Sequence, residues 1–235
     1  MIVALQTARA GSKSVPSKNI AMVGDKSLFL YNILSAQKSR LIEDVYVSTD
    51  CPYIKRLSKE WNYNIIDRPQ HLCGDNASHH DTIRHGLTEI EHRAERVELL
   101  VVLLGNSVAA YSCDLDASIE IMLNNKDIDS VTSVSEFDMF NPSRAYSIVN
   151  GRLDTIMSQD MIASKTIGNP NDKNAMGKIY FFNGSFWVCK RCSVLRDDGM
   201  LPFPWMGQRS IPYVQKTTME VDAEWQLSYL KREMM

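Results

Sequence analysis

The chain has 235 residues, of which 44% are hydrophobic and 23% are charged, and its formal net charge is −2. This composition is ordinary for a globular protein, and we expect a single domain over residues 1–235. The slightly acidic charge argues against a nucleic-acid-binding protein, which usually needs a basic surface. No apolar run approaches the roughly 20 residues of a membrane span, and no leader pattern precedes the first strand-like run. We therefore expect a cytoplasmic protein with no membrane association.

The elements expected along the chain alternate between strands and helices. Strand-like apolar runs lie at residues 2–5, 45–47, 99–104, 130–134 and 178–182. Helices are expected over residues 28–39, 52–61 and 81–92, and from residue 223 to the carboxyl terminus. Strands that are apolar throughout are typical of a parallel sheet with helices on both faces. The expected fold class is therefore α/β with three layers, in which ligands bind at the carboxyl ends of the strands.

Residues 138–177 differ from the rest of the chain. They are polar, contain several turn signals and show no sustained period. Long irregular connections inside a domain are uncommon unless they are functional. We expect a lid, a small subdomain or an arm that reaches a partner subunit.

The five cysteines are odd in number and scattered along the sequence, unlike the pattern of a disulfide scaffold. We expect free thiols. Cys189 and Cys192 have the spacing of a zinc-binding pair, but no second pair of ligands stands out. A metal role is therefore not expected there.

Residues 8–19, ARAGSKSVPSKN, follow the first strand-like run. Gly11 permits unusual backbone conformations, Ser12 adds a hydroxyl donor, and Lys13 and Lys18 add positive charge. A loop that leaves a parallel strand can also direct backbone N–H groups at an anion. The segment suits a polyphosphate, although it matches neither the Walker A loop nor the GxGxxG fingerprint. The alternative is a solvated surface turn.

This loop resembles the signature of the cytidylyltransferases that activate acidic sugars, the CMP-sialic acid and CMP-Kdo synthetase family. Five more segments resemble the family's motifs in the same order. They are VYVSTD (45–50), DRPQHLCGDNAS (67–78), DSVTSVSEFDMFNP (129–142), YFFNGSFWV (180–188) and EVDAEWQL (220–227). Ordered motifs are more specific than any single match. The resemblance implies a nucleotidyltransferase fold of the Rossmann-like kind.

The resemblance also assigns the nucleotide site. The residues that would bind CTP are Ala8, Arg9, Gly11, Ser12, Lys13, Lys18, Asn19, Arg68, Asp75, Ala77 and Ser78. Among them Arg9, Lys13 and Lys18 would stabilise charge on the triphosphate, and the stretch from Arg68 to Ser78 would form the nucleobase end. For Arg9 the alternative is a salt bridge that anchors the loop.

His79, His80 and Asp81 follow Ser78 and invite a metal site. Adjacent histidines do not share a helix face, so we interpret this stretch as a helix start, with Ser78 or Asp81 near the cap.

Glu220 and Asp222 are the candidate metal ligands. Residues two apart in an extended segment project to one face, so both carboxylates could hold one Mg²⁺ on the phosphates of CTP. Asp222 is expected to act in catalysis through this ion. The family has two aspartates here, whereas this chain has the longer Glu220 at the first position. The alternative is that these acids only favour the dipole of the following helix.

The acceptor side of the site departs from the family pattern. Family members continue LLQPTSPLR after the third strand, whereas this chain has LLGNSVAAY at residues 103–111, and Thr7 replaces a proline. By the resemblance, the acceptor-binding residues would be Asn106, Ser107, Lys173, Asn174, Tyr180 and Asn183.

Together these features predict a Mg²⁺-dependent enzyme that transfers CMP from CTP to an acidic sugar, a sialic-acid-like nonulosonic acid or a Kdo-like acid, and releases pyrophosphate. By the resemblance, residues 138–177 would reach across a homodimer. Two alternatives stay open: another small anionic acceptor such as a phosphonate, and an inactive nucleotide-binding homologue.

Overall fold

The computed structural model describes residues 1–94, 96–137, 140–172, 174–216, 218 and 220–233. The chain divides into two compact units. The large unit comprises residues 1–133, 184–213 and 219–235, and the small unit comprises residues 134–183 and 214–218. Each unit is described separately.

Within the described residues, seven strands form one sheet in the order β11-β7-β10-β6-β1-β4-β5. Their bounds are β1 Ile2–Thr7, β4 Asp44–Thr49, β5 Asn64–Asp67, β6 Leu99–Leu104, β7 Ser130–Glu136, β10 Tyr180–Lys190 and β11 Ser210–Gln215. β1 is parallel to β4 and β6, β4 is parallel to β5, and β10 is antiparallel to β6. The predicted α/β fold with a mostly parallel sheet is confirmed.

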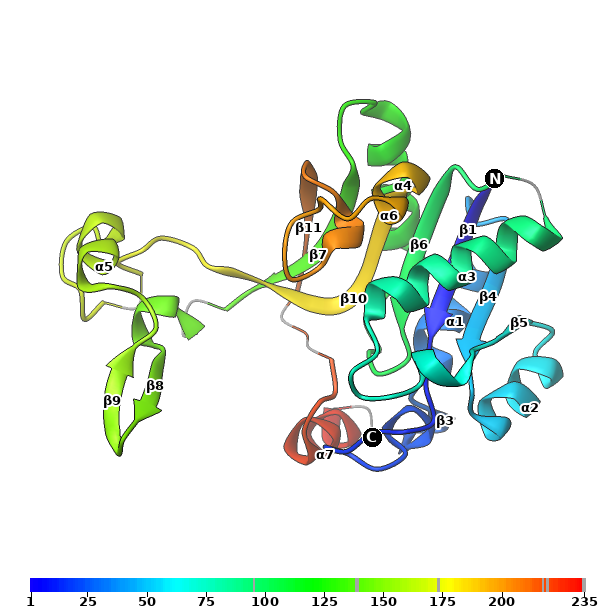
Figure 1. Cartoon of the computed structure of the whole chain (residues 1–235), viewed down its shortest axis with the longest axis horizontal. Coiled ribbons are helices and arrows are strands. Elements are labelled where there is room, and N and C mark those ends of the chain that lie inside the picture. Colours follow the sequence, from blue (N-terminus) through cyan, green and yellow to red (C-terminus); the bar gives the residue numbers. More distant parts are fainter. Residues whose placement is uncertain (95, 138–139, 173, 217, 219, 234–235) are drawn as a thin grey trace. The chain divides into compact units, whose positions relative to one another are not determined.

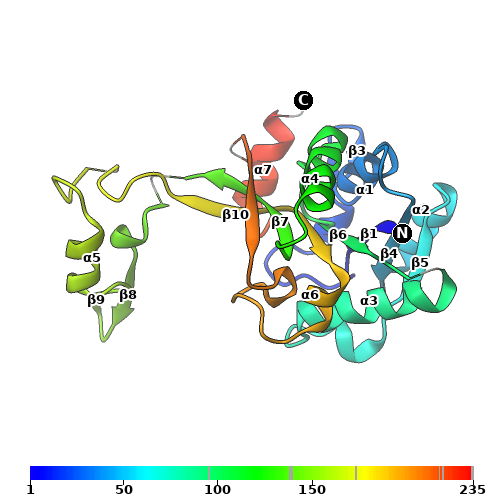
Figure 2. The same cartoon turned by 90° about the horizontal axis from the view of Figure 1, so that it is seen from above.

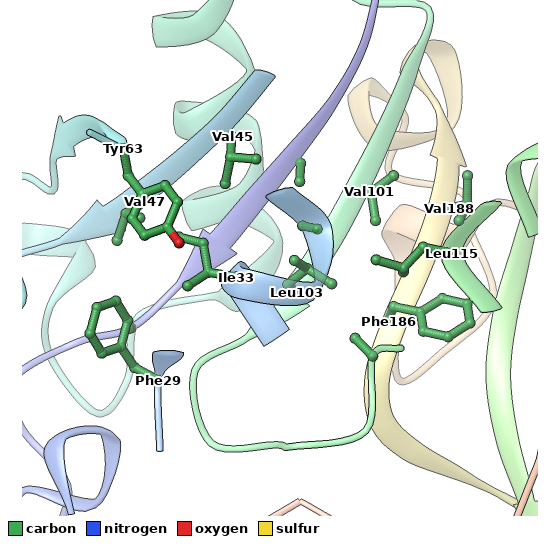
Figure 3. Packing of buried hydrophobic residues seen from close by; sticks show 14 of the residues in the cluster. Phe29, Ile33, Val45, Val47, Tyr63, Val101, Leu103, Leu115, Phe186 and Val188 are labelled. Carbon is green, nitrogen blue, oxygen red and sulfur yellow. The ribbon is translucent and has the colours of Figure 1, made fainter. Parts of the chain in front are cut away.

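Helices cover both faces of this sheet (Figures 1 and 2). Those of the large unit are α1 Leu30–Gln37, α2 Pro52–Glu60, α3 His79–Arg93, α4 Ser112–Asn124, α6 Arg191–Leu195 and α7 Glu224–Glu233. On β1, Ala4 packs in one buried cluster with α1, α2 and α4, whereas Val3 and Leu5 pack in another with α3 and α6. Alternate residues of a strand point to opposite faces, so a strand that is apolar throughout has to be covered twice. Figure 3 shows part of the first cluster, in which Phe29, Ile33 and Leu115 pack with strand residues such as Val47, Val101 and Val188.

A third apolar cluster, here called the terminal cluster, joins the two ends of the chain. It contains Val15, Val23, Leu28, Val221, Leu227 and Leu230. The first three belong to the segment after β1, which includes the short strands β2 (Met22–Val23) and β3 (Lys26–Ser27). The others belong to α7 and the residues before it. α7 therefore lies against the segment that follows β1 (Figure 1).

The small unit contains regular elements that the sequence did not predict. β8 (Tyr146–Val149) and β9 (Arg152–Thr155) form an antiparallel hairpin, and α5 (Gln159–Lys165) follows. Asn150 and Gly151 both have positive φ and form the two-residue turn. Asn-Gly is the pair that a type I′ hairpin turn prefers.

Several expected boundaries were wrong. β10 extends to Lys190 instead of ending near residue 182, and α4, β5 and β11 were not expected. Short 3₁₀ turns lie at η1 Lys18–Ile20, η2 Gln70–Leu72, η4 Pro142–Arg144 and η5 Pro204–Met206. All five cysteines are free, as expected. Among the described residues, no helix combines the length and the apolar character needed to cross a membrane.

Leu100 lies in the central strand β6 with no exposed surface. We expect Leu100→Ala to lower the free energy of unfolding by about 2–5 kcal/mol, because it leaves a cavity between the sheet and α3. Leu123→Ala, at a 44% exposed position of α4, should cost less than about 1 kcal/mol. Urea unfolding of both variants measures the difference, and equal losses would contradict the layered core.

Candidate functional site

A cavity of about 290 Å³ lies in the large unit, where β1 and β6 end at Thr7 and Leu104. Its lining consists of Thr7, Arg9, Lys18, Asn19, Arg68, Leu72, Gly74, Asp75, Ala77, His79, Thr82, Leu104, Asn106, Glu220 and Asp222. A larger cavity of about 590 Å³ lies at the opposite ends of these strands and contains none of the predicted site residues. The smaller cavity is therefore the candidate site, at the edge of the sheet where the sequence predicts it.

Nine of the predicted site residues meet in this cavity. They are Arg9, Lys18, Asn19, Arg68, Asp75, Ala77, Asn106, Glu220 and Asp222. They come from the loop after β1, the loop after β5, the end of β6 and the segment before α7. Residues more than 200 positions apart thus line one space.

The loop after β1 is tied to the loop after β5 by charge. Asp75 pairs with Arg9 at 2.9 Å and with Lys13 at 2.6 Å. Hydrogen bonds from Lys13 and Arg9 hold the pKa of Asp75 below its usual value. Lys13 is largely exposed and does not line the cavity, and exposed ion pairs contribute little stability. Arg9 makes the anchoring salt bridge considered from sequence and also faces the cavity.

Lys18 and Asp222 connect the amino-terminal loop to the carboxyl-terminal acids. The Lys18 ammonium lies 2.6 Å from Asp222 Oδ1, and the lysine side chain is only 16% exposed. Asn19 supports the loop from within, because its amide donates to the carbonyl oxygen of Arg9. A cationic loop and an acidic segment therefore face the same space.

The acidic pair owes its direction to the residue between its members. Val221 is fully buried in the terminal cluster, so Glu220 and Asp222 project the other way, into the cavity. Burial, followed by the charge of Asp222, raises the pKa of Glu220. Gly184 makes room for Glu220: a Cβ there would lie 2.9 Å from Glu220 Cβ, and its φ of +71° also favours glycine.

Arg68 is buried and lines the cavity. Its Nη2 donates to the carbonyl oxygen of Ser48 at 2.7 Å, and its Nε donates to Ser48 Oγ at 3.2 Å. Burial lowers the pKa of Arg68, although a guanidinium stays charged in proteins. Strand β4 therefore fixes a positive charge that the cavity presents to a ligand.

The other predicted site residues lie outside the cavity lining. Ala8, Gly11, Ser12, Lys13, Ser78 and Ser107 are in the large unit but do not line it. Ser78 Oγ accepts a hydrogen bond from Asp81 N and caps α3, which confirms the predicted helix start. Ala8 and Ser107 are buried.

The remaining acceptor candidates belong to the small unit or lie outside the described residues. Asn183 is buried, and its amide donates to Ser135 Oγ and Gln215 Oε1. Tyr180 is exposed, as is Asn174. Lys173 lies outside the described residues.

The segment after β6 explains one departure from the family pattern. A Cβ at Gly105 would lie 2.8 Å from Ala8 Cβ and 3.3 Å from Thr7 O. The loop after β1 therefore packs directly against position 105. A glutamine side chain, as in the family pattern, has no room there unless this loop shifts.

Six residues of the cavity lining were not among the predicted site residues: Thr7, Leu72, Gly74, His79, Thr82 and Leu104. His79 shares a 3.0 Å hydrogen bond with Thr7 Oγ1, and its ring lies edge-on to Trp205. Burial lowers the pKa of His79 to about 4, so the imidazole is neutral at pH 7. Its position at the start of a helix after a Gly-Asp-Asn turn was the available signal.

Two carboxylates that share a cavity fit a divalent cation. Within the described part of the chain, no three His, Cys, Asp or Glu side chains gather closely enough to form a metal cage. Mg²⁺ is usually bound by one or two carboxylates together with substrate phosphates, and not by a dedicated protein cage. Glu220 and Asp222, opposite Lys18 and Arg68, match that donor set.

His79 predicts a specific dependence of stability on pH. Its pKa falls from 6.5 to about 4 on folding, so the folded state binds fewer protons than the unfolded state between these values. The neutral His79 therefore stabilises the folded state fully above pH 6.5, and this stabilisation is lost as the pH falls towards 4. Between pH 7 and 4.5 the free energy of unfolding should fall by about 2 kcal/mol more for the wild type than for His79→Gln. This value is smaller than that for a fully buried ring, because the His79 ring also faces the cavity.

Urea unfolding at a series of pH values measures this difference. The matched control is His92→Gln, at an exposed position near the other end of α3, which should follow the wild type. Parallel curves for the wild type and His79→Gln would contradict the assignment.

This chain is similar to known proteins over most of its length. A protein of Campylobacter coli named post-translational flagellin modification protein B is 25% identical over 221 residues, which cover 92% of this chain and 88% of that one. The CMP-N,N'-diacetyllegionaminic acid synthase of Campylobacter jejuni is 26% identical over the same shares. A structure of CMP:2-keto-3-deoxy-manno-octonic acid synthetase complexed with CTP has the same fold, with a TM-score of 0.70, 17% identity, and coverage of 99% of this chain and 98% of that one.

The model of the cytidylyltransferase family matches residues 3–148. These residues include every residue of the cavity lining except Glu220 and Asp222. Because the match covers more than half of the chain, this protein belongs to the cytidylyltransferase family.

Proposed function

We propose that the protein transfers CMP from CTP to an acidic sugar of the nonulosonic class and releases pyrophosphate. The observation that carries this proposal is the meeting of Lys18 and Arg68 with Glu220 and Asp222 in one cavity. Cations alone would suit a free anion, and carboxylates alone would suit a free cation. Both together suit a nucleoside triphosphate that carries a divalent ion.

The reaction forms one bond at the α-phosphorus of CTP and breaks another. A hydroxyl oxygen of the sugar bonds to that phosphorus and loses its proton to the solvent, while the bond from phosphorus to the bridging oxygen of the β-phosphate breaks. Pyrophosphate leaves with the electron pair of the broken bond. Lys18, Arg68 and Arg9 stabilise the negative charge that grows on the leaving group.

Mg²⁺ is the proposed cofactor, held by Asp222 and Glu220. It supplies charge neutralisation on the phosphates of CTP when bound. Asp222 is already paired with Lys18, so the lysine is placed to move from the carboxylate to a phosphate oxygen. This exchange keeps the net charge of the cavity balanced while the substrate enters.

The acceptor class rests on the relatives. By its name, the Campylobacter jejuni relative makes CMP-N,N'-diacetyllegionaminic acid, a sugar acid linked to CMP. Position 105 leaves no room for a side chain that reaches an acceptor. Recognition of the carboxylate therefore falls to residues at other positions. Because CTP is an intracellular metabolite, the proposed reaction takes place in the cytoplasm.

A homodimer through the small unit is the proposed assembly. Few of this unit's described residues are buried, whereas Ile148, Leu153 and Ile167 are 78%, 71% and 84% exposed. An exposed apolar hairpin and a short helix bury too little surface to be stable alone. A second copy of the same unit covers such a surface with a matching one, as in obligate dimers.

Pyrophosphate release with CTP and Mg²⁺ tests the function. The acceptors are N-acetylneuraminic, legionaminic and pseudaminic acids, Kdo, and one phosphonate. We expect turnover with at least one sugar acid, and a CMP-sugar detected by mass spectrometry. Turnover with the phosphonate alone would show that the acceptor is a phosphonate and not a sugar acid. Thermal stabilisation by CTP without turnover would indicate an inactive homologue.

Lys18→Met should lower kcat/KM by about 100-fold or more, because a charge on the triphosphate is lost from a largely buried position. Lys59→Met, at an exposed position of α2, is the matched control and should leave kcat/KM unchanged. A Lys18 variant with wild-type kinetics would exclude the proposed site.

The dimer has its own test. Ile148 and Leu153 are directly paired across β8 and β9, so Ile148→Asp with Leu153→Asp should place two charges in the interface and give monomers in analytical ultracentrifugation. Leu201→Asp, at an 85% exposed position of the large unit, should remain dimeric. A monomeric wild type would overturn the proposal.

A further inference from the structure

Asn106 joins the end of β6 to the acidic segment by contacts in both directions. Its Nδ2 lies 3.2 Å from Glu220 Oε2, 3.1 Å from Val221 O and 3.3 Å from Asp222 Oδ1. The main-chain carbonyl oxygen of Asn106 accepts a hydrogen bond from Val221 N at 2.8 Å. The side chain is buried, so these contacts replace bonds to water.

The acidic segment depends on such contacts for its position. In the part of the chain that the structure describes, residues 220–223 belong to no helix or strand. Val221 packs in the terminal cluster, and Gln226 Oε1 accepts from Asp222 N and Ala223 N. Val221 and Gln226 therefore hold only the main chain of this segment. Asn106, by contrast, also contacts the two carboxylates.

Asn106 is itself fixed relative to the loop after β1. Leu104 is paired with Thr7 in the parallel register of β6 and β1, and Gly105 N donates to Thr7 O at 3.1 Å. The amide nitrogen therefore has a set position with respect to both the cationic loop and the acids. A shared donor also draws two like charges together that would otherwise repel each other.

We infer that Asn106 is a positioning residue that holds Glu220 and Asp222 at the separation at which both contact one divalent ion. This inference rests on the proposed function, and it gives Asn106 a different role from the acceptor contact expected from sequence. The amide acts as a neutral donor: it orders the carboxylates and leaves their charge available to the ion.

Substitutions at Asn106 separate this role from two others. Asn106→Ala removes the donor, and Asn106→Asp replaces it with a third carboxylate of the same shape. If Asn106 positions the carboxylates, both variants should bind the ion more weakly than the wild type. The aspartate variant should bind it most weakly, because its charge repels the other two carboxylates. If Asn106 is instead an oxygen ligand of the ion, Asn106→Asp should bind the ion at least as tightly as the wild type. If Asn106 contacts the sugar acceptor, both variants should have a raised KM for the sugar and an unchanged affinity for the metal.

The measurement is Mn²⁺ binding to the full-length protein without nucleotide, followed by electron paramagnetic resonance. We expect Asn106→Ala to bind Mn²⁺ about fivefold more weakly than the wild type, as for one lost hydrogen bond, and Asn106→Asp to bind it more weakly still. The matched control is Asn125→Ala, at the end of α4, where the amide donates to Ile121 O on the surface. It should bind Mn²⁺ as the wild type does.

Thermal unfolding of each variant shows that the fold is retained. Unchanged Mn²⁺ affinity in folded Asn106→Ala, tighter binding in Asn106→Asp, or no Mn²⁺ binding by the wild type would overturn the inference. These outcomes are distinct from failure of the proposed function, which appears as absent turnover in the wild type with every acceptor.

Discussion

The apolar contact between Val221 and the segment after β1 is the constraint on which the site depends. Val15, Val23 and Leu28 form one side of this contact, and Val221 with α7 forms the other. Burial of a valine side chain stabilises by about 1.5–3 kcal/mol, which is more than an exposed ion pair provides. Because Val221 points into this cluster, its two neighbours point into the cavity. Hydrophobic packing thus determines where the charges lie.

The electrostatics of the cavity follow from that placement. Glu220 and Asp222 repel each other, and their repulsion is offset by Lys18 on one side and by the amide of Asn106 on the other. Arg68 is held by Ser48 at the end of β4, so its charge stays available to a ligand. A cavity that holds cations and carboxylates at fixed positions is complementary in charge to the triphosphate and metal ion that we propose as its ligands.

Much of the large unit could be predicted from the sequence, because its strands are apolar throughout and its site residues fall in ordered segments. The loop after β1 and the pair Glu220 and Asp222 were recognised by their pattern, and the cavity contains both. The part played by Asn106 could not be predicted, since it depends on a contact between residues 115 positions apart. His79 was interpreted only as a helix start, because a single sequence does not show that Thr7 lies beside it.

The small unit was the least predictable part. Ile148 and Leu153 lie in strands of only four residues, which are too short for a sustained period. The Asn150-Gly151 pair was the one local signal of the hairpin. Phe181 and Phe182 belong to the strand-like run at residues 178–182, but each is 38% exposed, and both lie in the part of β10 that belongs to the small unit.

The most direct test of the account is a crystal structure with CTP and Mn²⁺, in which anomalous scattering locates the metal. The account predicts a manganese peak bound by Asp222 and Glu220, in contact with a phosphate oxygen of a CTP molecule whose triphosphate also contacts Lys18. A metal bound elsewhere, or CTP bound outside the 290 Å³ cavity, would contradict the claim that the two ends of the chain hold one substrate.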